Sequence, residues 1–227
     1  MKATQISKQV WSLRTWVIIP ITVWVVVEED GVTLIDTGIP TMAKGIMKFI
    51  EQLQAGPLKR ILLTHGHSDH VGSLKAILSK HNVPVFAHRK EIPFIEGELP
   101  YSGKKLMTTL PKGATQALQE NGQGQLQPIG GLAPYFTPGH SPGHAVYYHE
   151  ADQVLLAGDL FSSKNGKLRK PLFTPDMSEV LNSSTIVSKL RPARLEVCHG
   201  SSVFKPAEQL DEYVAGIRKT HPSVTAN

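Results

Sequence analysis

The sequence predicts an α/β (α+β) fold in which two β-sheets are flanked by helices. Short runs rich in Val, Ile and Thr alternate with segments whose apolar residues recur at helical spacing, and this alternation occurs in both halves of the chain. The 227 residues are 41% hydrophobic and 19% charged, which suits one globular domain with its own core. Because no repeat, low-complexity tract or linker divides the chain, residues 1–227 are expected to form a single domain.

The first elements expected are three strands of an antiparallel meander, at residues 10–13, 16–27 and 31–36. The apolar stretch 16–27 is too short to span a bilayer, contains Pro20 and ends in acidic residues without an Ala-x-Ala cleavage pattern. We therefore interpret it as a buried strand and expect no membrane insertion.

A helix and a βαβ-like alternation are expected next. Thr41 can cap a helix whose apolar residues share one stripe, namely Met42, Ile46, Phe49, Ile50 and Leu53. A strand at 59–64, a helix at 73–80 and a strand at 83–87 complete the first half.

The second half is expected to contain more strands followed by two helices. The strands are predicted at 125–129, 133–137, 145–149, 154–157 and 194–198. One helix is expected at 178–190, with Asp176 and Glu179 at capping-box spacing, and another at 206–219.

Residues 91–124 fit neither pattern. This segment is too apolar for a solvated linker and too rich in Gly and Pro for one long helix. We interpret it as a candidate lid over a pocket, with plain surface packing as the alternative.

The strongest chemical signal is the sequence HGHSDH at residues 65–70, between an expected strand and an expected helix. Three imidazoles and a carboxylate so close together are costly to bury unless each polar group has a partner. A borderline cation such as zinc provides such partners, and Gly66 lets the backbone turn tightly between ligands. The motif predicts that His65 and His67 point to one ion, and Asp69 and His70 to a second.

HGHSDH is similar to the HxHxDH signature of the metallo-β-lactamase superfamily, and the resemblance extends from about residue 31 to residue 200. Asp36 resembles the family's early aspartate, whose carboxylate supports the metal loop without binding metal. The other matches to family ligands are His140 at the first site, Asp159 as the bridge between the ions and His199 at the second site. The resemblance implies a four-layer αββα sandwich with the metals at one edge.

The resemblance also implies a dinuclear metal-dependent hydrolase. Two divalent ions, expected to be Zn²⁺ with Mn²⁺ or Fe²⁺ as alternatives, would generate a bridging hydroxide that attacks a carbonyl of a small lactone, ester or thioester. Asp69 would orient the water and pass a proton to the leaving group. The alternatives are a hydroxyacylglutathione hydrolase-like thioesterase, a β-lactamase-like amide hydrolase, a mononuclear iron persulfide dioxygenase, and a phosphodiesterase or nuclease.

Two departures from named branches are visible. Acyl-homoserine lactonases have a tyrosine shortly after the bridging aspartate, whereas Asp159 is followed by Leu160, Phe161 and Ser162. Hydroxyacylglutathione hydrolases carry a C-terminal helical substrate domain, whereas 27 residues follow Gly200 here. A true antibiotic-degrading β-lactamase is less favoured, because those enzymes commonly have cysteine in place of Asp159.

The expected partner is a small-molecule substrate with an apolar portion. The net charge of +5 and the pI near 9.3 permit an anionic partner, but basic residues are scattered, so nucleic acid binding is not expected. A single cysteine, Cys198, excludes an internal disulfide and is compatible with the cytoplasm, the expected location. The sequence leaves the oligomeric state open, including a homodimer.

The remaining histidines and the cysteine are given no catalytic role. His144 is expected to hold the loop of His140 by hydrogen bonds, and Cys198 to be a small buried apolar residue. Solvent exposure is expected for His81, His88, His149 and His221.

Overall fold

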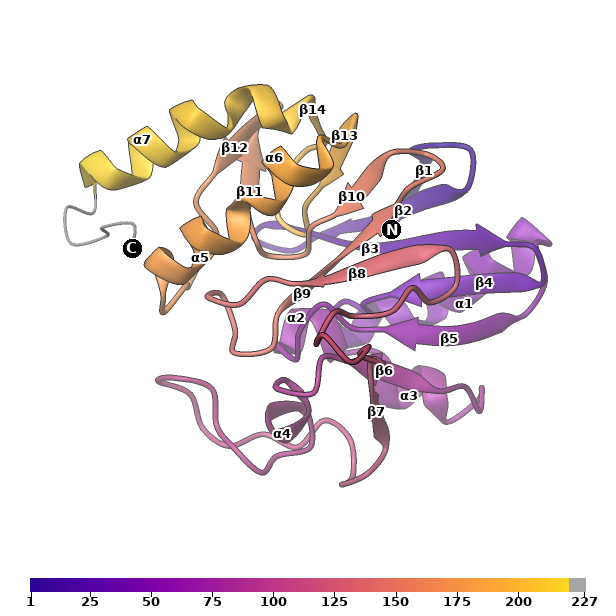
Figure 1. The fold of residues 1–227 in the computed structure, drawn as a ribbon. Helices are drawn as coiled ribbons and strands as arrows, with labels where there is room; N and C mark the ends of the chain where they lie inside the picture. The colour runs from indigo at the N-terminus through magenta and orange to yellow at the C-terminus, as the bar shows by residue number, and fades with distance from the viewer. Residues whose placement is uncertain (221–227) are drawn as a thin grey trace.

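The chain forms two sheets that pack face to face between layers of helices. The structure is a computed structural model and describes residues 1–220, so His221 lies outside the described residues. Figure 1 shows α5, α6 and α7 over the outer face of one sheet, and α1 and α3 over the outer face of the other. The four-layer αββα sandwich confirms the predicted fold class.

The larger sheet has seven strands in sequence order. It begins as the predicted antiparallel meander, and from β4 onward neighbouring strands are parallel, because crossovers containing helices connect them. The strands are β1 (Lys2–Gln5), β2 (Val10–Trp16), β3 (Pro20–Glu28), β4 (Gly31–Ile35), β5 (Leu58–Leu62), β6 (Val85–Ala87) and β7 (Thr115–Ala117).

The second sheet has five strands in the order β14-β13-β10-β9-β8, and a separate two-stranded ribbon joins β11 to β12. Within the five-stranded sheet, β10 and β13 are parallel, so their carboxyl ends meet at one edge. The strands are β8 (Leu132–Phe136), β9 (Ala145–His149), β10 (Val154–Leu156), β13 (Arg194–Glu196) and β14 (Val203–Phe204), and the ribbon is β11 (Ser162–Lys164) and β12 (Lys167–Arg169).

Short helical segments connect the strands and cover the sheets. The segments of the first half are η1 (Pro40–Met42), α1 (Ala43–Leu53), α2 (Ser68–Val71), α3 (Leu74–Leu78) and α4 (Ile92–Ile95). Those of the second half are α5 (Met177–Ser184), α6 (Ile186–Leu190), η2 (Pro206–Gln209) and α7 (Leu210–Thr220). No helix within residues 1–220 is long and apolar enough to cross a membrane.

Alternate side chains of the second sheet serve two cores. Tyr147 of β9 packs between the sheets with the core of the larger sheet, whereas Val146 and Tyr148 pack beneath the helices of the second half. All five residues of β9 are buried, which explains its continuous apolar character. The prediction of a strand at 145–149 is confirmed without change.

The prediction of one long strand at 16–27 is wrong at its start. Trp16 ends β2, and Val17 and Ile18 lie in the turn before β3; the three residues are 69%, 65% and 89% exposed. The apolar run continues through this turn, so hydrophobicity alone could not locate it.

Several other element predictions need correction. Residues 125–129 form no strand and make only isolated bridges, Glu120 to Leu126 and Ile129 to Leu132. Thr41 caps no helix, because it lies inside η1. The helix expected at 178–190 is divided at Thr185 into α5 and α6, although Asp176 does cap it by accepting a hydrogen bond from the Glu179 amide at 2.9 Å.

Residues 91–124 contain more regular structure than expected. The segment includes α4 and then β7, which pairs in parallel with β6 and completes the larger sheet. Between α4 and β7, part of the segment lies beside the HGHSDH motif, where Tyr101 packs against His67 with ring centroids 4.5 Å apart. The candidate lid is therefore anchored to the sheet at its C-terminal end.

His88 and His149 contradict the expectation of solvent exposure, because they are 4% and 3% exposed. The His88 ring stacks on Phe136 with centroids 4.1 Å apart, and burial lowers its pKa to about 4. His149 accepts a hydrogen bond from the Asp152 amide at 3.3 Å. Both side chains fill gaps between segments distant in sequence, which sequence patterns do not reveal.

Candidate metal centre

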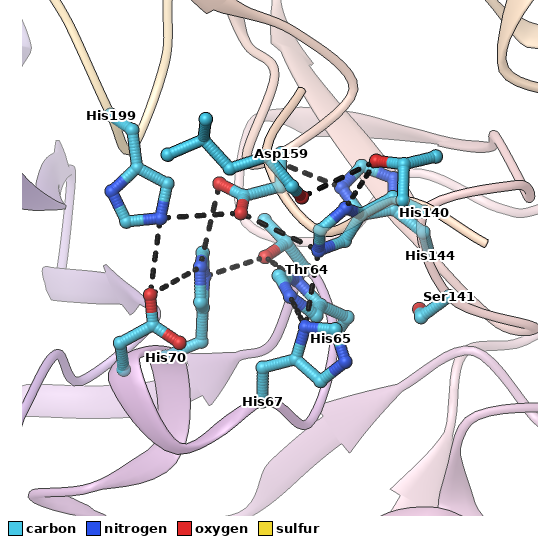
Figure 2. Close-up of polar contacts among 12 residues, drawn as sticks. Thr64, His65, His67, His70, His140, Ser141, His144, Asp159 and His199 are labelled. Atoms are coloured by element: carbon cyan, nitrogen blue, oxygen red, sulfur yellow. Dashed lines mark hydrogen bonds and ion pairs between the residues drawn. The ribbon is translucent and has the colours of Figure 1, made fainter. Parts of the chain in front are cut away.

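The seven side chains predicted to bind metal come together where strands of both sheets end. His65 and His67 follow β5, and Asp69 and His70 lie in α2. The remaining three each follow a strand of the second sheet, in the order His140 after β8, Asp159 after β10 and His199 after β13. Figure 2 shows the labelled members of this set converging on Asp159 from separate segments.

His65, His67 and His140 form a first cluster of donors. Nδ1 of His67 lies 2.9 Å from Nε2 of His65 and 3.1 Å from Nε2 of His140. A single ring nitrogen cannot form hydrogen bonds to two other ring nitrogens at once, because it either donates its one proton or accepts one through its one lone pair. Zinc bonds of about 2.0–2.1 Å in a tetrahedral site would separate neighbouring nitrogens by about 3.3 Å, close to the observed spacing.

Electrostatics keep this first cluster neutral. Burial lowers the pKa of His65 well below its usual value, lowers that of His67 to about 2 and lowers that of His140 to about 4, with nearby imidazoles adding to the effect. Neutral imidazoles carry free lone pairs, the form in which histidine binds a metal. The cluster therefore fits a cation.

Asp69, His70 and His199 form a second group, next to which Asp159 lies. Nε2 of His199 lies 3.1 Å from a carboxylate oxygen of Asp69 and 3.3 Å from one of Asp159. Within residues 1–220, Nε2 of His70 and Oδ1 of Asp159 are buried without a hydrogen bond and lie 3.5 Å apart. Buried polar atoms without partners are costly, so these two atoms also fit a cation.

Asp159 lies between the two groups. Its Oδ2 is 3.4 Å from Nε2 of His140 on one side and 3.3 Å from Nε2 of His199 on the other. Burial alone would raise the pKa of Asp159, but His70 and His199 hold it well below the usual value, so the carboxylate is ionised. This is the position of a carboxylate that could contact two ions.

Asp36 is hydrogen-bonded to the loop that carries His65, His67 and His70. Its two carboxylate oxygens accept hydrogen bonds from the Thr64 amide at 2.8 Å and from the Thr64 hydroxyl at 2.7 Å. The second oxygen also pairs with Nδ1 of His70 at 2.7 Å, which leaves Nε2 of His70 facing the cluster. Among residues 1–220, Asp36 belongs to none of the metal-compatible groups.

His144 also acts through hydrogen bonds, as expected. Its Nδ1 lies 2.9 Å from the Thr137 hydroxyl, and its Nε2 accepts a hydrogen bond from the Asp159 amide at 3.1 Å. Burial lowers the pKa of His144 to about 3, so the ring stays neutral and can accept from that amide.

Cys198 is buried in the core, as expected, and its sulfur lies within 4.8 Å of side-chain atoms of Asp69, His70 and His199. Another residue near the site was missed by the sequence analysis. Glu91 is fully buried and bonded to the loops that carry the histidines. In the sequence, Glu91 follows Arg89 and Lys90 and resembles part of a charged surface run.

A pocket of about 590 Å³ opens beside His199. The turn between β2 and β3 forms one wall, and the β11–β12 ribbon forms another. Its apolar lining comes from Trp16, Ile19, Pro20 and Leu172, and its basic lining from Arg14, Lys164 and Arg169.

Comparison with known proteins places this centre in a family. The family model described as "Metallo-beta-lactamase superfamily" matches residues 17–199, so the chain belongs to the metallo-beta-lactamase superfamily. It is 38% identical over 203 residues to the probable metallo-hydrolase YybB of Bacillus subtilis (strain 168), covering 88% of this chain and 90% of that protein. It is 27% identical over 180 residues to the hydroxyacylglutathione hydrolase GloC of Haemophilus influenzae, covering 77% and 82%.

Solved structures share the fold. The metallo-beta-lactamase family protein TTHA1429 from Thermus thermophilus superposes with a TM-score of 0.73 at 21% identity, over 95% of this chain and 81% of that chain. TTHA1623, solved in a di-iron-bound form, superposes with a TM-score of 0.65 at 25% identity, over 86% and 94%.

Proposed function

We propose that this chain is a two-metal hydrolase that adds water to the carbonyl carbon of a small lactone, ester or thioester with an apolar portion and so cleaves its acyl C–O or C–S bond. The broader class, a metal-dependent hydrolase, follows from the family and from its metallo-hydrolase relatives. The observation that carries the finer proposal is the position of Asp159 between two groups of buried donors.

Each residue has a distinct part in the proposal. His65, His67 and His140 would hold one divalent ion, Asp69, His70 and His199 the other, and Asp159 both. When bound, two such ions lower the pKa of a water and polarise a carbonyl. Zinc is the ion we propose, because imidazole and carboxylate donors suit it; iron and manganese are the alternatives.

Asp69 is the proposed proton carrier. Its side chain is 31% exposed, whereas those of His70, Asp159 and His199 are at most 6% exposed. A carboxylate within the donor set that also reaches solvent can orient a water and then deliver its proton to the leaving group.

The pocket beside His199 supports a small substrate. Its apolar wall suits an acyl chain, and its basic residues suit an anionic group at the other end. A thioester with an anionic leaving group, the class suggested by the hydroxyacylglutathione hydrolase relative, is the second candidate that this lining favours.

The proposal is tested with a substrate panel on zinc-reconstituted protein. The panel contains acyl lactones, aryl esters, lactoylglutathione and a cephalosporin, with Asp69→Asn as the matched variant. We expect turnover of an ester, lactone or thioester that falls at least about 100-fold in Asp69→Asn, as for loss of a general acid–base. Oxygen uptake with a persulfide on an iron-loaded protein, and no hydrolysis on the panel, would instead indicate a dioxygenase.

A further inference from the structure

A buried carboxylate outside the metal-compatible groups joins three segments around the site. Glu91 lies at the start of α4 and is 0% exposed. One of its oxygens, Oε1, accepts hydrogen bonds from the Gly66 amide at 2.9 Å and from the Tyr101 hydroxyl. The other, Oε2, accepts from the Ser141 hydroxyl at 2.9 Å and from the Gly143 amide at 2.7 Å.

The four donors belong to the parts of the chain that carry the first donor cluster. Gly66 lies between His65 and His67, and Ser141 directly follows His140. Tyr101 belongs to the candidate lid and packs against the His67 ring in a T-shaped arrangement. One carboxylate therefore contacts both loops that supply imidazoles to the first cluster, and the lid as well.

The backbone is shaped for this arrangement. A Cβ atom on Gly143 would lie 2.2 Å from the Glu91 amide nitrogen, and a Cβ atom on Gly66 would lie 2.3 Å from the Tyr101 hydroxyl oxygen. Both distances are too short for any side chain, so glycine at these positions permits the close approach.

The hydrogen bonds of Glu91 also exclude it as a metal ligand. A carboxylate has about four lone-pair sites, and four donors already occupy them. Its contribution to the site therefore passes through the positions of other residues.

We propose that Glu91 is a positioning residue: it fixes His67 and His140 at the separation needed for one ion, and through Tyr101 it couples the lid to that ion. This inference rests on the proposed metal binding. It predicts that metal affinity and the protection of the lid from proteolysis change together when the hydrogen bonds of Glu91 are altered.

The first test compares two buried carboxylates of the same segment. Glu96 is 8% exposed and accepts hydrogen bonds from the Gly113 and Thr115 amides, away from the donor clusters. Zinc affinity is measured by competition with a chromophoric chelator for wild type, Glu91→Gln and Glu96→Gln. We expect Glu91→Gln to bind its weakest zinc about 10- to 100-fold less tightly, as for other groups that orient ligands, and Glu96→Gln to match wild type.

Equal zinc affinity in wild type and Glu91→Gln would overturn the inference, as would an equal loss in both variants. If Glu91→Gln does not fold, Ser141→Ala replaces it in the zinc-affinity test. This variant removes one hydrogen-bond donor and leaves the carboxylate, so a smaller loss of zinc affinity is expected. A wild-type protein that binds no zinc would instead contradict the proposed function, so the two failures are distinguishable.

The second test measures the coupling to the lid. Lys104 and Lys105 are exposed trypsin sites next to Tyr101 in sequence. If zinc and the lid are coupled, zinc slows cleavage at these sites in wild type and has a smaller effect in Tyr101→Phe, since coupling between sites is reciprocal. Equal zinc protection in both proteins, or none in wild type, would contradict the coupling.

Discussion

The hydrogen bonds that Asp36 makes depend both on its backbone conformation and on its charge. Its φ of 57° lies in the left-handed region, which residues other than glycine seldom adopt. Among those that do, Asn and Asp are enriched. That conformation turns the carboxylate back onto Thr64 and His70, with contacts of 2.7–2.8 Å. Asparagine accepts the same backbone conformation, so it can separate the charge from the shape.

We expect Asp36→Asn to weaken zinc binding at the second group about 10- to 100-fold, because His70 loses the carboxylate that orients it. Asp36→Ala should bind zinc still more weakly, because it also loses the contacts to Thr64. Zinc affinity and melting temperature measured on both variants check this. Wild-type affinity in both would assign Asp36 to the turn alone.

At the scale of an element, the connection between β2 and β3 carries exposed apolar side chains that need an explanation. Exposing the apolar side chains of Trp16, Val17 and Ile18 to water is unfavourable. Trp16, however, also lines the pocket beside His199. A binding surface explains why apolar residues occupy an exposed turn.

Trp16→Ser is expected to raise KM for an acyl substrate about three- to tenfold with little change in kcat, because part of an aromatic contact worth about 1 kcal/mol is lost. Phe204→Ser is the matched control, since Phe204 is 62% exposed and lies outside the pocket lining. KM and kcat are measured for all three proteins with a long-chain and a short-chain ester. An equal rise in both variants would contradict a role for Trp16 in binding.

The elements also show what sequence patterns can and cannot predict. β9 was predicted in full, because its apolar run is bounded by polar residues and buried on both faces. β7 was missed because a three-residue strand of this kind exists only through pairing with β6, about 30 residues earlier. β11 and β12 were also missed, although Asn165-Gly166 between them is a typical turn of a short hairpin. The donor set followed from HGHSDH and the family resemblance, whereas Glu91 gave no local signal, because its partners come from segments up to 52 residues away.

At the scale of the whole molecule, the buried imidazoles make stability depend on pH. The folded pKa is about 2 for His67, about 4 for His140 and about 3 for His144, all lowered mainly by burial from a usual value of 6.5. The unfolded chain therefore binds more protons than the folded one between about pH 6.5 and pH 4, and stability falls as pH falls through this window. His70 and His199, whose pKa values are raised, are protonated in both states below about pH 6 and contribute no slope there.

We expect the urea midpoint of the metal-free protein to decrease from about pH 6 to about pH 4 and that of the zinc-loaded protein to decrease more steeply, because bound zinc would deprotonate His70 and His199 as well, so that the zinc-bound folded state holds fewer protons than the metal-free one. His81→Gln, which changes a partly exposed histidine outside the site, should leave the slope unchanged. A flat profile for the metal-free protein would contradict the neutral, buried state of these histidines.

The most direct test of the whole account is the zinc content of dialysed protein, measured by mass spectrometry for wild type and His67→Ala. Two zinc ions per wild-type chain are expected, and fewer in His67→Ala, because a ligand of the first cluster is deleted. A wild-type chain that retains no zinc, or a His67→Ala chain that retains as much as wild type, would contradict the proposal that these seven side chains hold two ions.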